Sequence, residues 1–353
     1  MTNPTTLHIS LEKIVFNWKQ YTSLCPNAEV SAVIKADAYG TGMKKVYDAL
    51  YSAGCKTFWV ATINEAKTLK KHDNNANVIV LGGICQDTYS DFIKHDITPV
   101  INSMEQLSFW ANQEKILPAW IQFDTAMSRL GISLKDVSKS IPILEGKKRD
   151  IKGYMSHLQM AEVSDSPISA KQKNIFDTIV KQLPTAKLSL TNTAGVFLGQ
   201  DYHYDVVRLG IGLYGLPCSD ISDTEFEQPL NLQSPVINVS LISEGDTVGY
   251  SATFTAVEDM TVATIAIGYA DGLSINLSNV ANLYYHGEIL PIIGRISMDT
   301  LVVDASNVPS IKEGQIVTIF DTSDDISIIS TCAGIPEQCV ISSLTNRVIR
   351  KYK

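Results

Sequence analysis

A lysine ends an apolar run in the segment EVSAVIKADAYGTG, where Lys35 follows residues 32–34. If the run is a strand of a parallel sheet, Lys35 lies at its carboxyl end, which is where barrel enzymes place their active sites. Burial and neighbouring cations lower the pKa of a lysine, and a neutral amine can form a Schiff base with an aldehyde. On this segment alone, a lysine that closes a strand and extends into solvent explains the pattern equally well.

Three more polar residues stand at the ends of apolar runs, namely His157, Thr193 and Arg208. A single histidine in such a place is more often structural than catalytic. Four polar groups at the ends of separate strands are harder to explain by packing, because the strand ends of a barrel meet at one rim. The four residues therefore predict an active site at this rim.

Glycines follow Arg208 in the segment RLGIGLYG. A turn there would leave the backbone N–H groups of Gly210 and Ile211 free to hold an anion. Glycines at a strand end also serve close packing alone, so the segment is weak evidence by itself. A phosphate site late in the strand order is nevertheless common in barrels.

Eight short apolar runs alternate with segments of helical periodicity between about residues 30 and 210. Eight parallel strands, each followed by a helix, indicate an α/β fold of the (β/α)8 TIM-like barrel type, and a doubly wound open sheet is the main alternative. The predicted strands are 30–35, 58–62, 78–82, 98–102, 120–124, 151–156, 188–192 and 206–208.

Past Pro229 the sequence changes to stretches of period two divided by Gly, Asp and Asn turns, which predicts a mostly β C-terminal domain. We expect the boundary within 219–227. A strand near residues 7–10 has no place among the eight and is expected to pack with the β domain. The predicted division is an N-terminal strand in 1–10, a barrel in 11–225 and a β domain in 226–353.

Composition excludes several classes of protein. The chain has 353 residues, of which 45% are hydrophobic, enough to fill two cores. Its 37 acidic and 29 basic residues give a net charge of −8 without basic clusters, which disfavours nucleic acid as a partner. No apolar stretch reaches the roughly 18 residues that span a bilayer, and the first residues lack a secretory signal, so we expect a soluble cytoplasmic protein.

The cysteines are scattered along the chain, with no C-x-x-C pair and no histidine cluster beside them. This spacing suggests neither a disulfide framework nor a metal site. We expect reduced and mostly buried thiols. The residues are Cys25, Cys55, Cys85, Cys218, Cys332 and Cys339.

Over nearly its whole length the chain resembles the alanine racemase family, whose members join a (β/α)8 barrel to a β domain and use pyridoxal 5′-phosphate. The most specific motif is AVIKADAYGTG, which contains Lys35. Five more motifs follow it, and six motifs in order argue against coincidence. The five are DTAMSRLG, TNTAG, VRLGIGLYG, IGYADG and GRISMD.

The resemblance implies how the cofactor is held. Lys35 would carry it through a Schiff base, and Arg208 would face its pyridine nitrogen. Because a guanidinium does not readily give up a proton, that nitrogen stays unprotonated and the cofactor is a weaker electron sink, which disfavours transamination. The other implied cofactor-binding positions are Tyr39, Thr193, Gly210, Ile211 and Asn346.

Racemisation removes a proton from one face of an α-carbon and returns it on the other, so it needs two acid–base groups. The resemblance implies that these are Lys35 and Tyr250, with His157 and Arg208 in a hydrogen-bond network that helps the phenol to ionise. In this family the tyrosine comes from the other subunit of a head-to-tail homodimer. Without the resemblance, Tyr250 would be interpreted as a packing residue on a strand.

Four further residues match family positions around the substrate. Arg129 and the backbone of Met298 resemble the contacts to the substrate carboxylate. Arg295 and Tyr269 resemble residues of the corridor through which substrate reaches the site. The expected partners are therefore a small amino acid and a second copy of the chain.

Four positions depart from the usual family pattern. Gln122 stands where many members have a carbamylated lysine that braces the substrate-binding arginine, although a neutral amide can still hydrogen-bond Arg129. Asn346 replaces a tyrosine and opens space beside the substrate side chain. Asp37 replaces a common asparagine, and Ala126 a common glycine.

The sequence predicts an enzyme that interconverts L- and D-alanine, the D form being a peptidoglycan precursor in bacteria. A broad-specificity or serine racemase on the same scaffold stays open, as does a protein that binds pyridoxal 5′-phosphate without turnover. The β domain with Tyr250 and Met298 argues against the latter, since holding a cofactor needs no second base. Arg208 argues against a decarboxylase or aldolase, which would want a protonated pyridine nitrogen or a metal.

Overall fold

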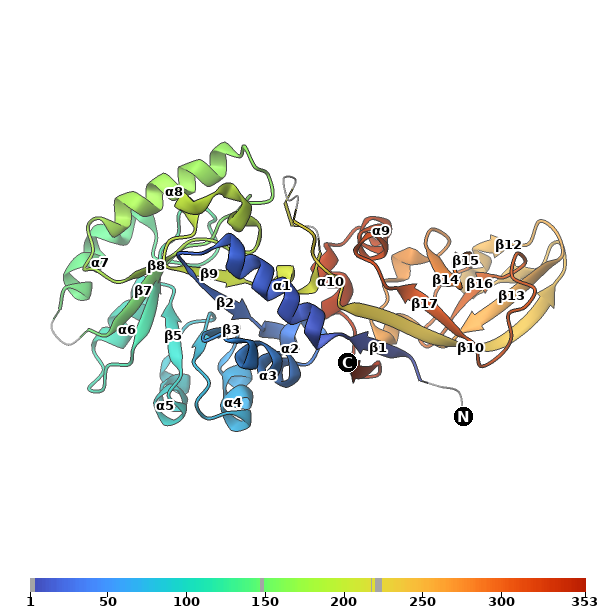
Figure 1. Ribbon diagram of the computed structural model, residues 1–353, viewed down its shortest axis with the longest axis horizontal. Helices are drawn as coiled ribbons and strands as arrows, with labels where there is room; N and C mark the ends of the chain where they lie inside the picture. Colours follow the sequence, from blue (N-terminus) through green and yellow to red (C-terminus); the bar gives the residue numbers. More distant parts are fainter. Residues whose placement is uncertain (1–3, 147–148, 217, 220–223) are drawn as a thin grey trace.

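Two bodies lie side by side along the long axis of the molecule in the computed structural model, a helix-covered barrel and a β domain (Figure 1). The structure describes residues 4–146, 149–216, 218–219 and 224–353. Part of the predicted domain boundary, 220–223, lies outside the described residues, as do residues 1–3 of the predicted N-terminal segment.

The eight predicted strands of the barrel are all present, and they form one parallel sheet in the order β8-β7-β6-β5-β4-β3-β2-β9. Backbone bonds from Asp205 N to Leu188 O and from Arg208 N to Thr191 O, both 3.1 Å, join β8 to β9. The sheet is therefore a barrel and not an open doubly wound sheet. The strands are β2 (Glu29–Val33), β3 (Phe58–Val60), β4 (Val78–Val80), β5 (Thr98–Ile101), β6 (Ala119–Gln122), β7 (Ile151–Met155), β8 (Lys187–Ser189) and β9 (Val206–Leu209).

Helices follow the strands, but within the described residues those after β8 and β9 are only short 3-10 turns. The space after β9 is covered by α1 (Leu11–Leu24), which comes before the first barrel strand and packs against α3 and the turn Ile211–Tyr214. The other helices of the barrel are α2 (Lys35–Gly40), α3 (Met43–Ala53), α4 (Ile63–His72), α5 (Gln86–His95), α6 (Met104–Ala111), α7 (Val137–Leu144) and α8 (Pro167–Val180).

Side chains fill the barrel interior, so it is a packed core and not a channel. Gly153 on β7 leaves room for an indole, since a Cβ there would lie 2.3 Å from the ring of Trp120. The interior residues are Val33, Trp59, Ile79, Val100, Trp120, Met155 and Val206.

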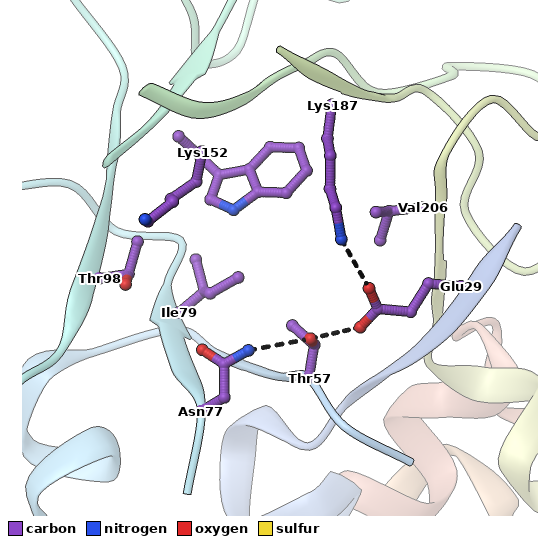
Figure 2. Close-up of a pocket in the computed structure, with 9 residues that line it drawn as sticks. Glu29, Thr57, Asn77, Ile79, Thr98, Lys152, Lys187 and Val206 are labelled. Atoms are coloured by element: carbon purple, nitrogen blue, oxygen red, sulfur yellow. Dashed lines mark hydrogen bonds and ion pairs between the residues drawn. The ribbon is translucent and has the colours of Figure 1, made fainter. Parts of the chain in front are cut away.

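A small cavity of about 170 Å³ opens at the amino-terminal end of the barrel strands (Figure 2). Lys187 Nζ lies 3.1 Å from Glu29 Oε2, Thr57 donates a hydrogen bond to the same carboxylate, and Asn77 Nδ2 donates to the Thr57 hydroxyl at 3.0 Å. These polar groups close the floor of the barrel. Because Glu29 begins β2 and Lys35 follows its end, the cavity lies at the opposite end from the predicted site.

The β domain is an eight-stranded sheet in the order β13-β16-β15-β14-β17-β10-β1-β18, and a further pairing of β13 with β10 curls it. Its first strand, β1, lies between β10 and β18. The strands are β1 (Thr6–Ile9), β10 (Leu230–Ile242), β13 (Met260–Ile265), β14 (Asn282–Tyr285), β15 (Glu288–Ile293), β16 (Leu301–Asp304), β17 (Ile316–Phe320) and β18 (Ile349–Tyr352), with a hairpin of β11 (Thr247–Val248) and β12 (Phe254–Thr255) and helices α9 (Ser323–Ala333) and α10 (Glu337–Ser342).

The six cysteines are free thiols, but the prediction that most are buried is wrong. Only Cys25 and Cys55 are buried, Cys218 and Cys332 are partly buried, and Cys85 and Cys339, at the start of α5 and within α10, are exposed. Among the helices of the described ranges, none combines the length and the apolar character needed to cross a membrane.

Candidate active site

Lys35 follows β2 directly and opens a turn of unusual backbone geometry. The four residues Ala36 to Tyr39 have φ between 51° and 57° and ψ between 36° and 53°, a left-handed helical turn without glycine. Each such residue costs about 1–2 kcal/mol, because its Cβ crowds the following carbonyl oxygen. A turn of this kind persists only where its surroundings hold it in place, and such places cluster at functional sites.

Two buried or half-buried side chains hold the turn from the barrel. Glu65 Oε1 accepts a hydrogen bond from Ala36 N at 2.7 Å, and Tyr214 Oη donates to Ala38 O at 2.5 Å. These bonds satisfy backbone groups that a left-handed turn leaves without regular helical partners. The lysine therefore projects from a fixed backbone.

Asp37, one of the departures from the family pattern, has a structural contact. Its Oδ1 accepts a hydrogen bond from Met43 N at 2.8 Å, at the first turn of α3, where a negative charge is favoured by the helix dipole. The carboxyl-terminal strand reaches the same turn, since Arg350 Nε donates to Gly40 O at 3.0 Å. The β domain and the barrel thus meet at the lysine turn.

The amine of Lys35 lies in a half-buried, electropositive place. Burial lowers the pKa of Lys35, the charge of Arg129 lowers it further, and the carboxylate of Glu65 acts in the opposite direction. A lowered pKa increases the fraction of neutral amine near neutral pH, which is the form that attacks a carbonyl or accepts a proton.

Arg208 and His157, predicted from separate strand ends, are in contact. Arg208 is 3% exposed, and it donates to the hydroxyl of Ser189, to Ser156 O at 2.6 Å, to Leu190 O at 3.2 Å and to His157 Nδ1 at 3.2 Å. Burial lowers the pKa of His157 to about 3, and the charge of Arg208 is the next cause. The imidazole is therefore neutral, and with Nδ1 accepting from a guanidinium its proton is on Nε2.

Hydroxyl and N–H groups from three neighbouring strand ends converge beside this pair. Thr193 Oγ1 accepts hydrogen bonds from Gly210 N at 3.1 Å and Gly212 N at 3.4 Å. A Cβ on Gly210 would lie 2.4 Å from Tyr39 Oη, so the hydroxyl of Tyr39 sits against the glycine backbone. Ile211 follows in the same turn. The expectation that the N–H of Gly210 is free to hold an anion is therefore wrong, because the Thr193 hydroxyl takes it. The hydroxyls of Thr193 and Tyr39 remain as donors that fit a phosphate, as pyridoxal 5′-phosphate would require.

The loop after β6 presents Arg129. Asp124 Oδ1 accepts hydrogen bonds from the N–H groups of Ala126, Met127 and Ser128 at 2.9–3.0 Å, which folds the loop around the carboxylate. Arg129 is exposed and makes no hydrogen bond or ion pair with a described residue. Its guanidinium is therefore free to pair with the carboxylate of a ligand.

Gln122 does not brace Arg129, contrary to the expectation from sequence. Its amide Nε2 donates to Leu130 O at 3.1 Å, and its backbone carbonyl accepts from Ile132 N at 2.8 Å. The reason is that an amide carries N–H donors, which find the nearest backbone carbonyl instead of a guanidinium. Gln122 thus holds the backbone of the loop and leaves the arginine side chain unsupported.

The predicted residues of the β domain lie on its surface, and among the described residues no hydrogen bond or ion pair joins their side chains to the barrel. Tyr250 is 71% exposed, Met298 52% and Tyr269 44%, and Arg295 is also exposed. The hairpin strand β12, which follows Tyr250, lies at the end of the β domain away from the barrel (Figure 1).

An ion-pair cluster that the sequence did not reveal fixes these loops. Arg347 Nε lies 3.2 Å from Asp271 Oδ1, and its Nη2 lies 2.7 Å from Asp299 Oδ1. Asp271 is close in the chain to Tyr269, and Asp299 directly follows Met298. The backbone of the two loops is also joined, because Ala270 N donates to Met298 O at 3.0 Å. Asn346 precedes the arginine and is exposed.

Glu65, Ser156 and Ser189 were also missed by sequence reasoning. The spacing of Thr62 and Glu65 is that of a capping box, which signals a helix start and could have placed Glu65 beside the end of β3. The two serines carry no local signal, since they are recognised only through their contacts with Arg208.

A lysine, a histidine and an arginine at the carboxyl-terminal rim of a barrel, joined to a separate β domain, define the class of a two-domain barrel enzyme. The family models "Alanine racemase, N-terminal domain" and "Alanine racemase, C-terminal domain" match residues 9–217 and 230–352. The chain belongs to the alanine racemase family.

Relatives match over nearly the full length. The alanine racemases of Rickettsia akari and Rickettsia canadensis are 33% and 34% identical to this chain, and in each comparison 98% of both chains is covered. The crystal structure of the Bartonella henselae alanine racemase with covalently bound pyridoxal phosphate superposes with a TM-score of 0.95 at 36% identity, covering 99% of this chain and 100% of that one. The biosynthetic enzyme of Pseudomonas aeruginosa has a TM-score of 0.92 at 27% identity, with 99% of both chains covered.

Proposed function

We propose that this chain is a pyridoxal 5′-phosphate-dependent racemase that interconverts L- and D-alanine, with Lys35 and Tyr250 of the partner subunit as the two bases. The observation that carries the proposal is the left-handed turn that holds a half-buried Lys35 at the same rim as the contact between Arg208 and His157. Membership of the family supports the reaction, and the covalently bound cofactor of the Bartonella relative supports the cofactor.

The residues that would hold the cofactor come from adjacent strand ends. Its phosphate would lie among Tyr39, Thr193, Gly210 and Ile211, with Asn346 nearby and Lys35 as the point of covalent attachment. Arg208 would donate to the ring nitrogen and keep it unprotonated. When bound, pyridoxal 5′-phosphate withdraws electrons from the substrate α-carbon and makes its proton acidic.

Proton transfer would then be divided between two faces of the α-carbon. The lowered pKa of Lys35 supports its use as one base, since the neutral amine can take a proton near neutral pH. Tyr250 of the partner subunit would act on the other face. His157, neutral and bonded to Arg208, would pair with the phenol through its Nε2–H and stabilise the phenolate.

The substrate would be oriented by its carboxylate. The unpaired guanidinium of Arg129 and the backbone of Met298 would bind it, and Arg295 and Tyr269 would line the corridor to the site. The 71% exposure of Tyr250 supports a head-to-tail homodimer, because a base that faces solvent in one copy needs a second copy to place it. The active site would be incomplete in a monomer.

A serine racemase, or one of broader specificity, is the second candidate. It is favoured by Asn346, a short side chain where a tyrosine is common in the family. Comparing turnover of L-alanine and L-serine tests this candidate, and strict use of alanine would count against it.

The remaining expectations from sequence belong to the same proposal. We propose a cytoplasmic enzyme that supplies D-alanine for peptidoglycan, without nucleic acid or membrane as a partner. We also propose the division into an N-terminal strand in 1–10, a barrel that binds the cofactor in 11–225 and a β domain in 226–353. The position of β1 between β10 and β18 supports assigning the first strand to the β domain.

Exchange of the α-proton tests the proposed reaction. The purified protein, incubated with L-alanine in deuterated water, should show the visible absorption of its bound cofactor, incorporate deuterium at the α-carbon and form D-alanine. Protein that carries the cofactor but exchanges no α-proton would overturn the racemase assignment. Protein without the cofactor after addition of pyridoxal 5′-phosphate would overturn the proposed site.

A further inference from the structure

Glu65 joins the end of β3 to the lysine turn. Its Oε2 accepts hydrogen bonds from Ala61 N at 2.8 Å and Thr62 N at 2.9 Å, while Oε1 accepts from Ala36 N at 2.7 Å. Ala36 is the residue that follows Lys35. One carboxylate therefore ties the strand end next to β2 to the first residue of the left-handed turn.

These contacts exceed what the start of α4 requires. In a capping box the glutamate bonds only the backbone of the N-cap residue, which here is Thr62. The bond to Ala36 crosses to another βα unit, and Ala36 has a φ of 51°. A carboxylate makes a stronger hydrogen bond to an N–H group than a neutral acceptor does, so it suits a backbone that must be held in an unfavourable conformation.

The same carboxylate is a counter-charge for the lysine. The charged or titratable groups that act on Lys35 are Arg129 and Glu65, and the neutral His157 is close enough to be affected by the lysine charge. Arg129 disfavours the ammonium form, and Glu65 favours it. Removing the charge of Glu65 leaves the effect of Arg129 unopposed.

We propose that Glu65 is a positioning residue, which fixes the backbone that carries Lys35 through Ala36 and places a negative charge beside the lysine. The proposal rests on the proposed function, since it assumes that the cofactor attaches to Lys35. It predicts that the geometry and the charge of Glu65 have separate, measurable effects on that attachment.

Glu65→Gln and Thr62→Ala form the decisive pair of variants. The first removes the charge and replaces one acceptor oxygen by an NH2 group. The second removes the hydroxyl that accepts from Glu65 N at 3.3 Å, so it weakens the same end of α4 but leaves the carboxylate in place. Any effect of a weakened helix start is therefore common to both variants.

The readout is attachment of the cofactor to the full-length protein, not turnover. Each protein is incubated with pyridoxal 5′-phosphate from pH 5 to 10, reduced with borohydride, and the labelled peptide is identified by mass. We expect the pH midpoint of attachment at Lys35 to fall by about 0.5–1 unit in Glu65→Gln, as loss of one nearby carboxylate implies. We expect the midpoint of Thr62→Ala to match the unaltered protein.

Each outcome has a defined meaning. Equal midpoints in all three proteins would overturn the role of Glu65 and leave the proposed function intact. Absence of label on Lys35 in the unaltered protein would overturn both. If Glu65→Gln does not fold, Glu65→Asp keeps the charge and shortens the reach to Ala36: attachment several-fold slower than in Thr62→Ala supports the proposal, and equal rates overturn it.

Discussion

Gly210→Ala is a sharp probe of the proposed phosphate site, because the added atom meets a single group. A Cβ at Gly210 would lie 2.4 Å from Tyr39 Oη, whereas ordinary contacts begin at 3.4 Å, so the hydroxyl must move by about 1 Å. This movement takes the Tyr39 hydroxyl away from the backbone N–H groups of Gly210 and Gly212, which contact Thr193. We expect the variant to fold and to bind pyridoxal 5′-phosphate weakly.

The expected loss follows from one hydrogen bond to a charged group. Such a bond contributes about 1.5–3 kcal/mol, which corresponds to an increase in Kd of about 10- to 100-fold. Overpacking should lower the free energy of unfolding by about 1 kcal/mol, the small end of the usual range, because the tip of a side chain can move more easily than backbone. Absorbance titration with the cofactor and urea unfolding measure the two effects.

The double variant Gly210→Ala with Tyr39→Phe separates the clash from the lost bond. Without the oxygen, the nearest ring atom is Cζ at 3.3 Å from the new Cβ, which is tight but tolerable. The double variant should therefore regain stability while its cofactor affinity stays low. Cofactor binding by Gly210→Ala as tight as in the unaltered protein would refute the placement of the phosphate beside Tyr39 and Gly210.

Three further changes test other parts of the structure. Ala126→Gly should raise the free energy of unfolding by about 0.5–1 kcal/mol. An alanine at a φ of 90° costs about 1–2 kcal/mol, and this gain exceeds the about 0.4–1 kcal/mol by which the greater chain entropy of glycine favours the unfolded state. A lower free energy of unfolding in urea would contradict this. The folded pKa of His157 is about 3, below its ordinary 6.5, so the unfolded chain takes up the proton first and stability falls as the pH decreases from 6.5 towards 3. His157→Gln should flatten that decrease, and unchanged slopes between pH 7 and pH 4 would count against it. Tyr250→Phe should keep the colour of the bound cofactor and slow deuterium exchange from one enantiomer of alanine far more than from the other; equal slowing would show that the tyrosine does not serve one face.

The barrel and its rim could be predicted because both depend on local pattern. Apolar runs at regular intervals mark parallel strands, and the carboxyl ends of such strands must meet, so Lys35, His157, Thr193 and Arg208 were placed together without knowledge of any contact. The structure brings His157 to within hydrogen-bond distance of Arg208.

The support of that rim could not be predicted, since it depends on tertiary contacts. The sequence of residues 36–39 does not indicate a left-handed turn, because the left-handed conformation is usually adopted by glycine or asparagine. No sequence pattern indicates that Gln122 donates a hydrogen bond to Leu130 O. None indicates that Arg347 pairs with two aspartates. The burial of the cysteines could not be predicted for the same reason, because it depends on whether another part of the fold covers each thiol.

The carboxyl-terminal stretch contacts two places that, in the proposed homodimer, belong to different active sites. Arg350 holds Gly40 in the lysine turn of its own chain, and Arg347 holds the loop of Met298, which in the proposed assembly completes the neighbouring copy. A chain altered at both Arg347 and Arg350, mixed with unaltered chains, would then inactivate both active sites of every dimer that it joins. Activity of such a mixture would fall with the square of the intact fraction, a dominant effect from a few residues at the end of the chain.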